Sequence, residues 1–165
     1  MNKKILLIVL VTLTIITSSS VVSAGLFDGF FEQQDNVVEI DNISFNTTNV
    51  TKFVLLNKTE QTGVCVVSYI DENDTRYTIN IINASTTSDS LYNQLFASYT
   101  EEFDNSPSQT VDGVILYTTS ANTGDNVGKP RYTSYFQNKD AKNIVEISSP
   151  NPNETAKMVL SFKFK

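Results

Sequence analysis

The chain has 165 residues, 40% of them hydrophobic and 18% charged, which is typical of a folded globular protein and excludes a disordered acidic tail or a membrane helix bundle. Histidine and tryptophan are absent and Cys65 is the only cysteine, which excludes histidine-based catalysis, a Ser-His-Asp or Cys-His nucleophile, a zinc site of the usual ligands and an intrachain disulfide. The formal net charge of −6 disfavours nucleic acid as a partner, because an acidic surface repels the phosphate backbone.

Residues 1–24 have the pattern of an export signal. Two lysines precede an apolar run from Ile5 to Ile16, and Val22-Ser23-Ala24 supplies the residues expected before a signal-peptidase cleavage site. We therefore predict cleavage after Ala24 and a protein that is secreted or held at the cell envelope. The alternative is an uncleaved anchor, because residues 5–27 carry no charge and are long enough to cross a membrane. In that case the N-terminal segment would be the contact with the membrane.

Residues 25–35 are predicted to form a short amphipathic segment. Its large apolar side chains recur at the spacing of one helical face, at Leu26, Phe27, Phe30 and Phe31. With two glycines and net negative charge, this segment is expected to pack against the body of the protein and not on a membrane.

Strand patterns dominate the next part of the chain. The clearest pair of strands is separated by the polar residues 71–74, which are typical of a hairpin turn and predict antiparallel pairing. In the first strand of that pair, Cys65 is interpreted as a small buried hydrophobic residue, because a reactive thiol would need a cationic neighbour. The segments expected to be strands here are Val38–Ile40, Ile43–Phe45, Phe53–Leu56, Val64–Ile70 and Arg76–Ile82.

One strong helix pattern follows, with Ser88 or Thr87 able to cap its start. The helix is expected to end in an acidic run, whose charges meet the negative end of the helix dipole unfavourably. We interpret that run as a contribution to solubility or as a contact for a partner. The apolar positions at helical spacing are Leu91, Tyr92, Leu95, Phe96, Tyr99 and Phe103, and the acidic run is Glu101, Glu102 and Asp104.

The last part of the chain predicts more strands and a second helix. Asn151 can cap this helix, Pro152 suits its first position, and Glu154 gives a capping-box-like arrangement. Ala156, Val159 and Leu160 would then face inward, although residues 161–165 could equally finish as a strand. The strands are expected at Val111, Val114–Thr119, Arg131–Gln137 and Ile144–Ser148.

The order of these elements, joined by turns of hairpin length, predicts an α+β fold. We expect residues 36–165 to be a single domain. In it, an antiparallel sheet of about six to seven strands would carry one central helix and a C-terminal helix packed on it.

Four segments within this layout carry a resemblance to a known fold. They are Ile43-Ser44-Phe45, Lys52-Phe53, Val111-Asp112-Gly113 and Ala156-Lys157-Met158-Val159-Leu160-Ser161-Phe162-Lys163. The chain from Asn36 to Lys165 resembles the Mog1/PsbP-like domains and is similar to small exported proteins of uncharacterised function from methane-producing archaea. It departs from them at Thr47-Thr48, where such domains commonly have a proline before the second strand. The resemblance implies a domain that binds partners without catalysis, and it transfers no site residue.

Two loops contain incomplete cofactor motifs. The segment from Asp71 begins like a calcium loop, but Arg76 stands where glycine is needed and Ile82 where a bidentate glutamate is needed. The segment Gly124–Lys129 is one residue too short between its glycines for a phosphate loop, and Pro130 replaces the required hydroxyl. We therefore predict no metal and no other cofactor.

The sequence contains seven Asn-x-Ser/Thr motifs, the acceptor pattern for N-linked glycans in exported proteins. Asn46, Asn49 and Asn73 are the candidates for glycosylation, because we expect them in loops. Polar composition alone is an equally good explanation of the motifs.

The sequence favours a non-enzymatic protein that binds an unknown protein or another component of the cell surface. The alternative is a carboxylate-dependent hydrolase of surface polysaccharide, which needs two carboxyl groups about 5–10 Å apart and one of them with a raised pKa. The acidic residues that could supply such a pair are Glu60, Glu101, Glu102, Asp104, Asp112 and Asp125.

Overall fold

A computed structural model of the chain describes residues 35–71, 76–121 and 127–165. These residues form a seven-stranded antiparallel sheet, a three-stranded antiparallel sheet and two helices. The predicted α+β class and antiparallel sheet are confirmed, but the prediction of one sheet is wrong, because the first two strands and the C-terminal strand form a sheet of their own. The export signal with Ala24, and residues 25–34 of the amphipathic segment, lie outside the described residues.

The seven-stranded sheet has the order β3-β4-β5-β9-β8-β7-β6. Each neighbouring pair is antiparallel, including the predicted hairpin of β4 and β5. The strands are β3 (Phe53–Gln61), β4 (Val64–Asp71), β5 (Thr78–Asn83), β6 (Ser108–Val111), β7 (Val114–Ser120), β8 (Pro130–Asn138) and β9 (Asn143–Ser149).

The three-stranded sheet, which we call the small sheet, has the order β1-β2-β10 and joins the two ends of the described chain. Its strands are β1 (Asn36–Ile40), β2 (Ile43–Thr47) and β10 (Lys163–Phe164). The short strand β10 pairs with the start of β2, with Lys163 opposite Ser44. The expectation that the C-terminal residues could finish as a strand is therefore confirmed.

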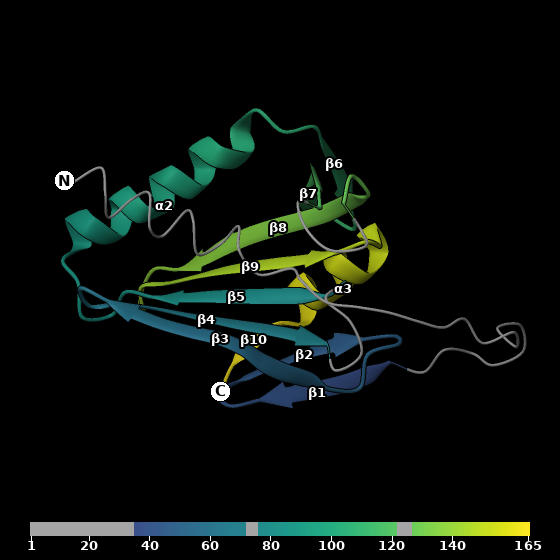
Figure 1. The fold of residues 1–165 in the computed structure, drawn as a ribbon, viewed down its shortest axis with the longest axis horizontal. Coiled ribbons are helices and arrows are strands. Elements are labelled where there is room, and N and C mark those ends of the chain that lie inside the picture. The colour runs from purple at the N-terminus through teal and green to yellow at the C-terminus, as the bar shows by residue number, and fades with distance from the viewer. Residues whose placement is uncertain (1–34, 72–75, 122–126) are drawn as a thin grey trace, which may run out of the picture.

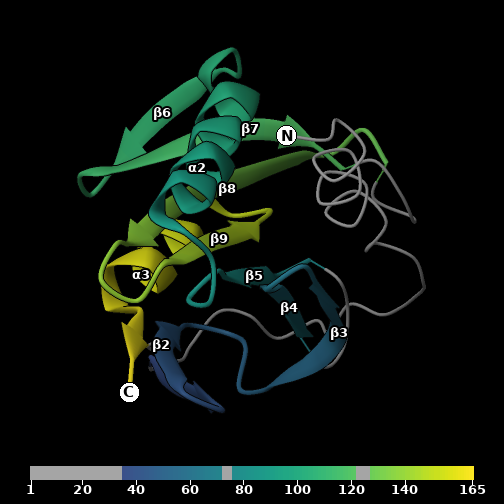
Figure 2. The same ribbon diagram turned by 90° about the vertical axis from the view of Figure 1, so that its left-hand side faces the viewer.

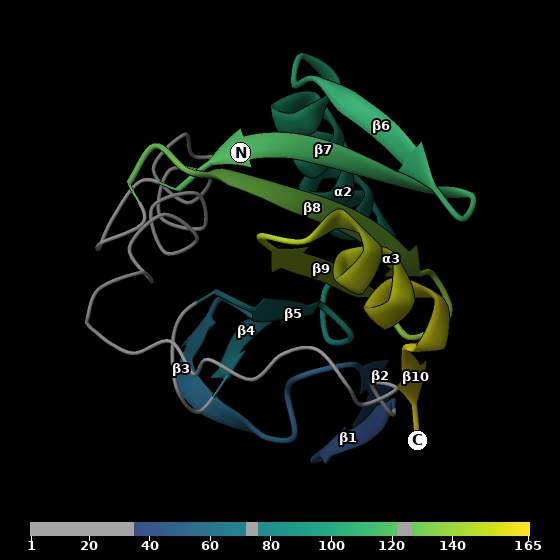
Figure 3. The same ribbon diagram turned by 90° about the vertical axis from the view of Figure 1, so that its right-hand side faces the viewer.

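The molecule has three layers, with the seven-stranded sheet in the middle (Figure 1). Helix α2 (Asp89–Asp104) covers one face, and helix α3 (Pro152–Ser161) and the small sheet cover the other. Figure 2 shows α2 in front of the sheet, and Figure 3, from the opposite side, shows α3 in front. Because side chains alternate along a strand, Ile144 of β9 packs beneath α2 whereas Ile147 packs toward the small sheet.

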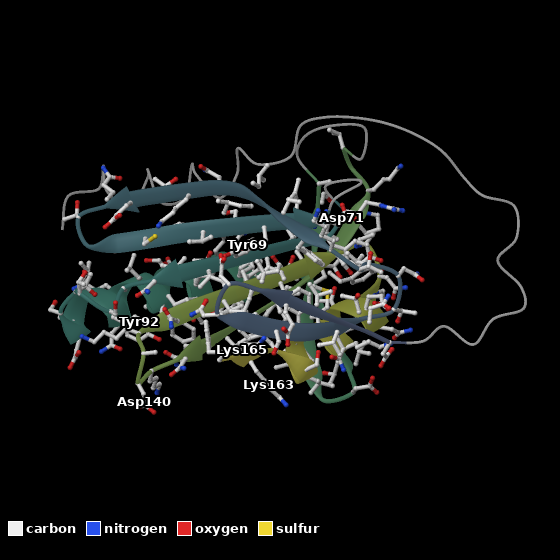
Figure 4. All side chains as sticks on the ribbon, turned by 90° about the horizontal axis from the view of Figure 1, so that it is seen from below. Tyr69, Asp71, Tyr92, Asp140, Lys163 and Lys165 are labelled. Atoms are coloured by element: carbon white, nitrogen blue, oxygen red, sulfur yellow. The ribbon has the colours of Figure 1, made fainter. Side chains whose placement is uncertain are left out.

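The small sheet is fastened to the seven-stranded sheet by both apolar and polar contacts. Phe45 of β2 is buried against Phe53, and the hydroxyl of Tyr69 on β4 donates a hydrogen bond of 2.6 Å to Asp41 Oδ2. Tyr69 lies between the two sheets in Figure 4. Burial and then the neighbouring Asp41 carboxylate raise the pKa of the Tyr69 hydroxyl above its usual value, so the hydroxyl remains a donor. On the same strand, Cys65 is only partly buried, which corrects the expectation of a buried residue.

Both helices begin where their capping residues predicted. The Ser88 hydroxyl accepts a hydrogen bond from the backbone N–H of Leu91, and the Asn151 side chain accepts from the N–H groups of Asn153 and Glu154. These contacts satisfy backbone donors that have no partner within the helix.

Two details predicted for α3 are wrong. Glu154 does not complete a capping box, because its carboxylate accepts hydrogen bonds from the backbone N–H of Thr48, at 2.9 Å, and from the Thr48 hydroxyl. Leu160 does not face inward, since its side chain is 61% exposed. Ala156 and Val159 do face inward as predicted, Ala156 fully buried and Val159 partly, and Met158 is fully buried on the same side.

Replacing Glu154 by alanine is expected to lower the free energy of unfolding by about 1–3 kcal/mol, because the Thr48 N–H loses the buried carboxylate that accepts its hydrogen bond. Urea denaturation measures the change. The matched control is Glu39→Ala, which removes an exposed ion pair with Lys165 and should change stability by less than about 1 kcal/mol. Equal losses in the two variants would show that Glu154 does not hold α3 to β2.

Candidate functional site

The candidate site is centred on Glu146, the charged residue of the central strand β9. Every other residue of this strand is buried, and Glu146 is partly buried. Ile144 packs beneath α2, and residues two apart on a strand share a face, so Glu146 also lies on the α2 side of the sheet. A carboxylate in such a place is unfavourable unless other groups compensate for its loss of water.

The compensating groups come from the elements that surround Glu146. Its Oε2 accepts a hydrogen bond of 3.1 Å from the Tyr99 hydroxyl on α2, and its Oε1 accepts one of 3.4 Å from the Asn80 amide on β5. On the other side, Tyr135 of β8 lies directly opposite Glu146 in the strand register. Both carboxylate oxygens of Glu146 are therefore engaged by the protein itself.

The pKa of the Glu146 carboxyl is raised to about 7, and the loss of water is the largest cause. This net value includes opposing effects: the hydrogen bonds from Tyr99 and Asn80 and the positive charge of Arg131 lower the pKa, whereas the Glu102 carboxylate on α2 raises it. Burial, followed by the charge of Glu146, raises the pKa of Tyr99 well above its usual value. The cluster can therefore hold or release a proton near neutral pH.

Aromatic rings pack around this cluster and attach the C-terminal half of α2 to the sheet. The Tyr135 ring stacks on Phe103, with centroids 5.1 Å apart, and on Tyr117, with centroids 5.5 Å apart. Tyr99 and Phe96 of α2 also contact Tyr135. Such ring pairs add to the apolar area that is buried, so the cluster lies inside a close-packed helix–sheet interface.

A second group of polar side chains lies on the same face of the sheet, further along the strands. The Arg131 Nε donates a hydrogen bond of 2.8 Å to Ser148 Oγ, and its Nη2 donates to Thr78 Oγ1 at 3.1 Å. Thr78 and Ser148 are each two residues from Asn80 and Glu146 on the same strands. This arrangement holds a positive charge on the face that carries Glu146, which explains why Arg131 lowers the pKa of that carboxyl.

The N-terminal end of α2 is anchored separately. The Lys142 ammonium group pairs with Asp89 at 2.8 Å and donates to the carbonyl oxygen of Thr87 at 2.7 Å. The hydrogen bond from Lys142, and then its positive charge, lower the pKa of the Asp89 carboxyl. Tyr92, labelled in Figure 4, is buried near the same end and donates a hydrogen bond to Gln137. Both ends of α2 are therefore held against the sheet.

The acidic residues named as possible catalytic pairs do not form one group. Glu60 is exposed at the end of β3, Asp112 is exposed in the turn between β6 and β7, and Asp125 lies outside the described residues. Glu101, Glu102 and Asp104 are exposed on the last turns of α2. Glu102 is the one whose charge acts on Glu146, and desolvation raises the pKa of Glu102 as well.

Sequence reasoning missed Glu146, although a signal was present. A single acidic residue stands within the apolar strand pattern of residues 144–148, and such a residue must either face solvent or find partners. Its partners, Tyr99 and Asn80, come from segments far away in the sequence, so the pattern alone could not identify them.

Two of the three glycosylation candidates can be placed. Asn49 is exposed in the connection between β2 and β3, as expected. Asn46 lies within β2 and not in a loop, and it is only partly exposed, which corrects that expectation. Asn73 lies outside the described residues.

The hydrogen bond of Tyr99 allows a direct test of the cluster. Tyr99→Phe is expected to lower the free energy of unfolding at pH 8 by about 1–3 kcal/mol, because the ionised Glu146 loses a donor. The loss should be smaller at pH 5, where the carboxyl is protonated. Tyr132→Phe is the control, since that ring packs on the opposite face beside Ala156. Denaturation at both pH values measures the effect, and equal, pH-independent losses would contradict it.

Within residues 35–71, 76–121 and 127–165, no group of three or more Cys, Asp or Glu side chains is placed to bind a metal ion. In the same ranges, no helix has the length and apolar character needed to span a membrane. Comparison with protein families, curated proteins and solved structures found no match to this chain.

Proposed function

We propose that the chain is an exported or cell-envelope protein that binds a macromolecular partner and does not catalyse a reaction. The pattern of residues 1–24 supports export. The observation that carries the binding role is the engagement of Glu146, whose two oxygens accept hydrogen bonds from Tyr99 and Asn80 beneath α2. A carboxylate held in this way links α2 to β5 and β9 and so fixes the position of the helix on the sheet. The expected resemblance to the Mog1/PsbP-like domains agrees with such a role and stays a prediction.

The outward side of α2 is the surface proposed for the partner. It is polar, with Asn93, Gln94 and Glu101 exposed, and the helix beneath it is held at both ends. A rigid surface loses little conformational entropy on binding, which favours recognition. Because the acidic residues gather at the C-terminal end of α2, the partner should carry positive charge there.

The test uses the full-length protein in the cells that produce it. A photo-crosslinking residue at Asn93, on α2, should capture one partner, whereas the same residue at the exposed Lys163, on β10, should not. The double variant Glu101→Lys, Glu102→Lys should reduce the captured amount at least tenfold, since it reverses the charge of the surface. Equal capture from both positions, or an unchanged captured amount in the double variant, would contradict the proposal.

The hydrolase remains the second proposal, because Glu146 has a raised pKa and lies near Glu102. A raised carboxyl pKa is what a general acid requires in glycoside hydrolysis. The test is to incubate the protein with surface polysaccharide from the same cells and to measure new reducing ends. Release by the unchanged protein but not by Glu146→Gln would replace the binding role with the catalytic one.

A further inference from the structure

The Asn-x-Ser/Thr motifs differ in how far their asparagines are exposed. Six of the seven lie in the described residues, and four of these side chains are exposed: Asn42, Asn49, Asn83 and Asn153. Asn46 and Asn57 are partly buried and lie within strands. In addition, Asn57 Nδ2, the atom that would carry a sugar, donates a hydrogen bond of 3.4 Å to the hydroxyl of Thr59. Exposure therefore selects four acceptors, of which only Asn49 was expected from the sequence.

Three of these four asparagines lie in the layer opposite α2, and the fourth lies at the end of β5. Asn42 is in the turn between β1 and β2, Asn49 is in the connection between β2 and β3, and Asn153 is in the first turn of α3. The small sheet and α3 form the layer opposite α2 (Figures 2 and 3). Asn83, at the end of β5, follows Ile82, which packs toward α2, so its side chain points to the opposite face.

Two of the acceptors are close neighbours. The Thr48 N–H and hydroxyl bond to Glu154, and these residues directly adjoin Asn49 and Asn153 in the sequence. Glycans on this pair would cover the junction of β2 with α3.

The α2 side of the molecule is different. From Ala84 to Pro150, which includes α2 and β6 to β9, the sequence contains no Asn-x-Ser/Thr motif. Asparagine itself is present there, and Asn93 and Asn105 are exposed at α2, but neither has Ser or Thr two positions later. Asn42, Asn49 and Asn153 are therefore separated from α2 by the seven-stranded sheet, whereas Asn83 stands at the end of β5, where its Oδ1 accepts a hydrogen bond of 2.9 Å from the N–H of Ser85.

We propose that the protein carries N-linked glycans at Asn42, Asn49, Asn83 and Asn153, none of them on the face of the sheet that α2 covers. The inference rests on the proposed export, because the acceptor motif is used in exported chains. In the transfer, the asparagine amide nitrogen bonds to the anomeric carbon of a sugar activated as a lipid-linked phosphate. The bond from that carbon to the phosphate oxygen breaks, the lipid phosphate leaves, and the amide gives one proton to a base of the transferase.

The arrangement deepens the proposed function by orienting the molecule. Glycans are bulky and solvated, so those on Asn42, Asn49 and Asn153 would keep the small sheet and α3 from close contact with other macromolecules. The α2 surface would stay accessible to the partner, because three acceptors lie on the other side of the seven-stranded sheet and the side chain of Asn83 points away from the face that α2 covers.

The experiment is intact-mass measurement and glycopeptide mapping of the full chain, purified from the separated cytoplasmic, envelope and medium fractions of its own cells. We expect the envelope or medium protein to exceed the polypeptide mass, with sugar on the four asparagines and none on Asn46 or Asn57. Asn49→Gln and Thr51→Ala should each remove the same one glycan, since both destroy one motif. Asn93→Gln, an exposed asparagine outside any motif, should leave the mass of the attached sugar unchanged.

The failures of the two proposals are distinguishable in this design. An exported protein with the bare polypeptide mass would overturn glycosylation and leave the binding role intact. A bare protein found only in the cytoplasmic fraction would overturn both. Sugar on Asn46 or Asn57 in place of the four exposed asparagines would show that exposure does not decide which asparagines are glycosylated, and would overturn the proposal.

Discussion

Replacing Phe45 by alanine is expected to lower the free energy of unfolding by about 3–5 kcal/mol, the usual cost of truncating a buried phenylalanine. The Phe45 side chain is 1% exposed between the two sheets. Its ring makes an edge contact with Phe53, with centroids 5.1 Å apart, and stacks on Phe162, with centroids 6.3 Å apart. The substitution would leave a cavity at the point where β2 and the C-terminal residues meet the seven-stranded sheet. Urea denaturation followed by circular dichroism measures the loss.

The matched control for this prediction lies in the same small sheet. Val37 of β1 is 66% exposed, so Val37→Ala should change the free energy of unfolding by no more than about 0.5 kcal/mol. A Phe45→Ala protein as stable as this control would show that the small sheet does not pack on the seven-stranded sheet through Phe45.

Replacing Glu146 by glutamine is expected to remove a pH dependence of stability. In the folded protein the pKa of Glu146 is about 7, raised from a usual value of 4.5 that the unfolded chain retains. Between these values the folded state binds a proton that the unfolded state does not, so stability falls as the pH rises from about 4.5 to 7. The shift corresponds to a loss of up to about 3 kcal/mol.

Several groups set the size of this effect, because they face Glu146 from the elements packed against it. They are Tyr99 and Glu102 from α2, Arg131 and Tyr135 from β8, and the uncharged Asn80 from β5. Glutamine retains the shape of glutamate and can bond to both Tyr99 and Asn80 without carrying charge. Glu146→Gln should therefore be more stable than the unchanged protein at pH 8 and similar to it at pH 5.

Denaturation curves at pH 5 and pH 8 measure this difference. Glu101→Gln is the control, because it removes an exposed carboxyl of the same helix and should leave the pH dependence as it was. If the unchanged protein and Glu146→Gln lose the same stability between pH 5 and pH 8, then Glu146 does not remain protonated up to neutral pH in the folded protein.

Local chemistry explains the parts of the fold that were predictable. Ser88 and Asn151 cap the two helices as their types and positions indicated, because an oxygen close in sequence satisfies the first free N–H groups. The hairpin of β4 and β5 was predicted from two β-rich segments on either side of a polar turn. These contacts all join residues that are near one another along the chain.

The errors concern contacts between distant segments. Glu154 has the spacing of a capping box, but Thr48 competes for its carboxylate once β2 lies beside α3. The pattern of β1 and β2 is that of ordinary strands, and nothing within it shows that Ser44 pairs with Lys163 and not with the larger sheet. Which strands pair depends on how the whole chain buries its apolar side chains. A local sequence pattern carries no information about that packing.

The sequence by itself determined the α+β class, the antiparallel pairing of hairpins and the capped starts of both helices, because each depends on periodicity and on short-range hydrogen bonds. Only the tertiary structure decided that a small sheet forms, that Glu146 lies beneath α2 with Tyr99 and Asn80, and which asparagines are exposed. The reason is that burial and the removal of water, which also raise the pKa of Glu146, arise from segments that meet only in the folded chain.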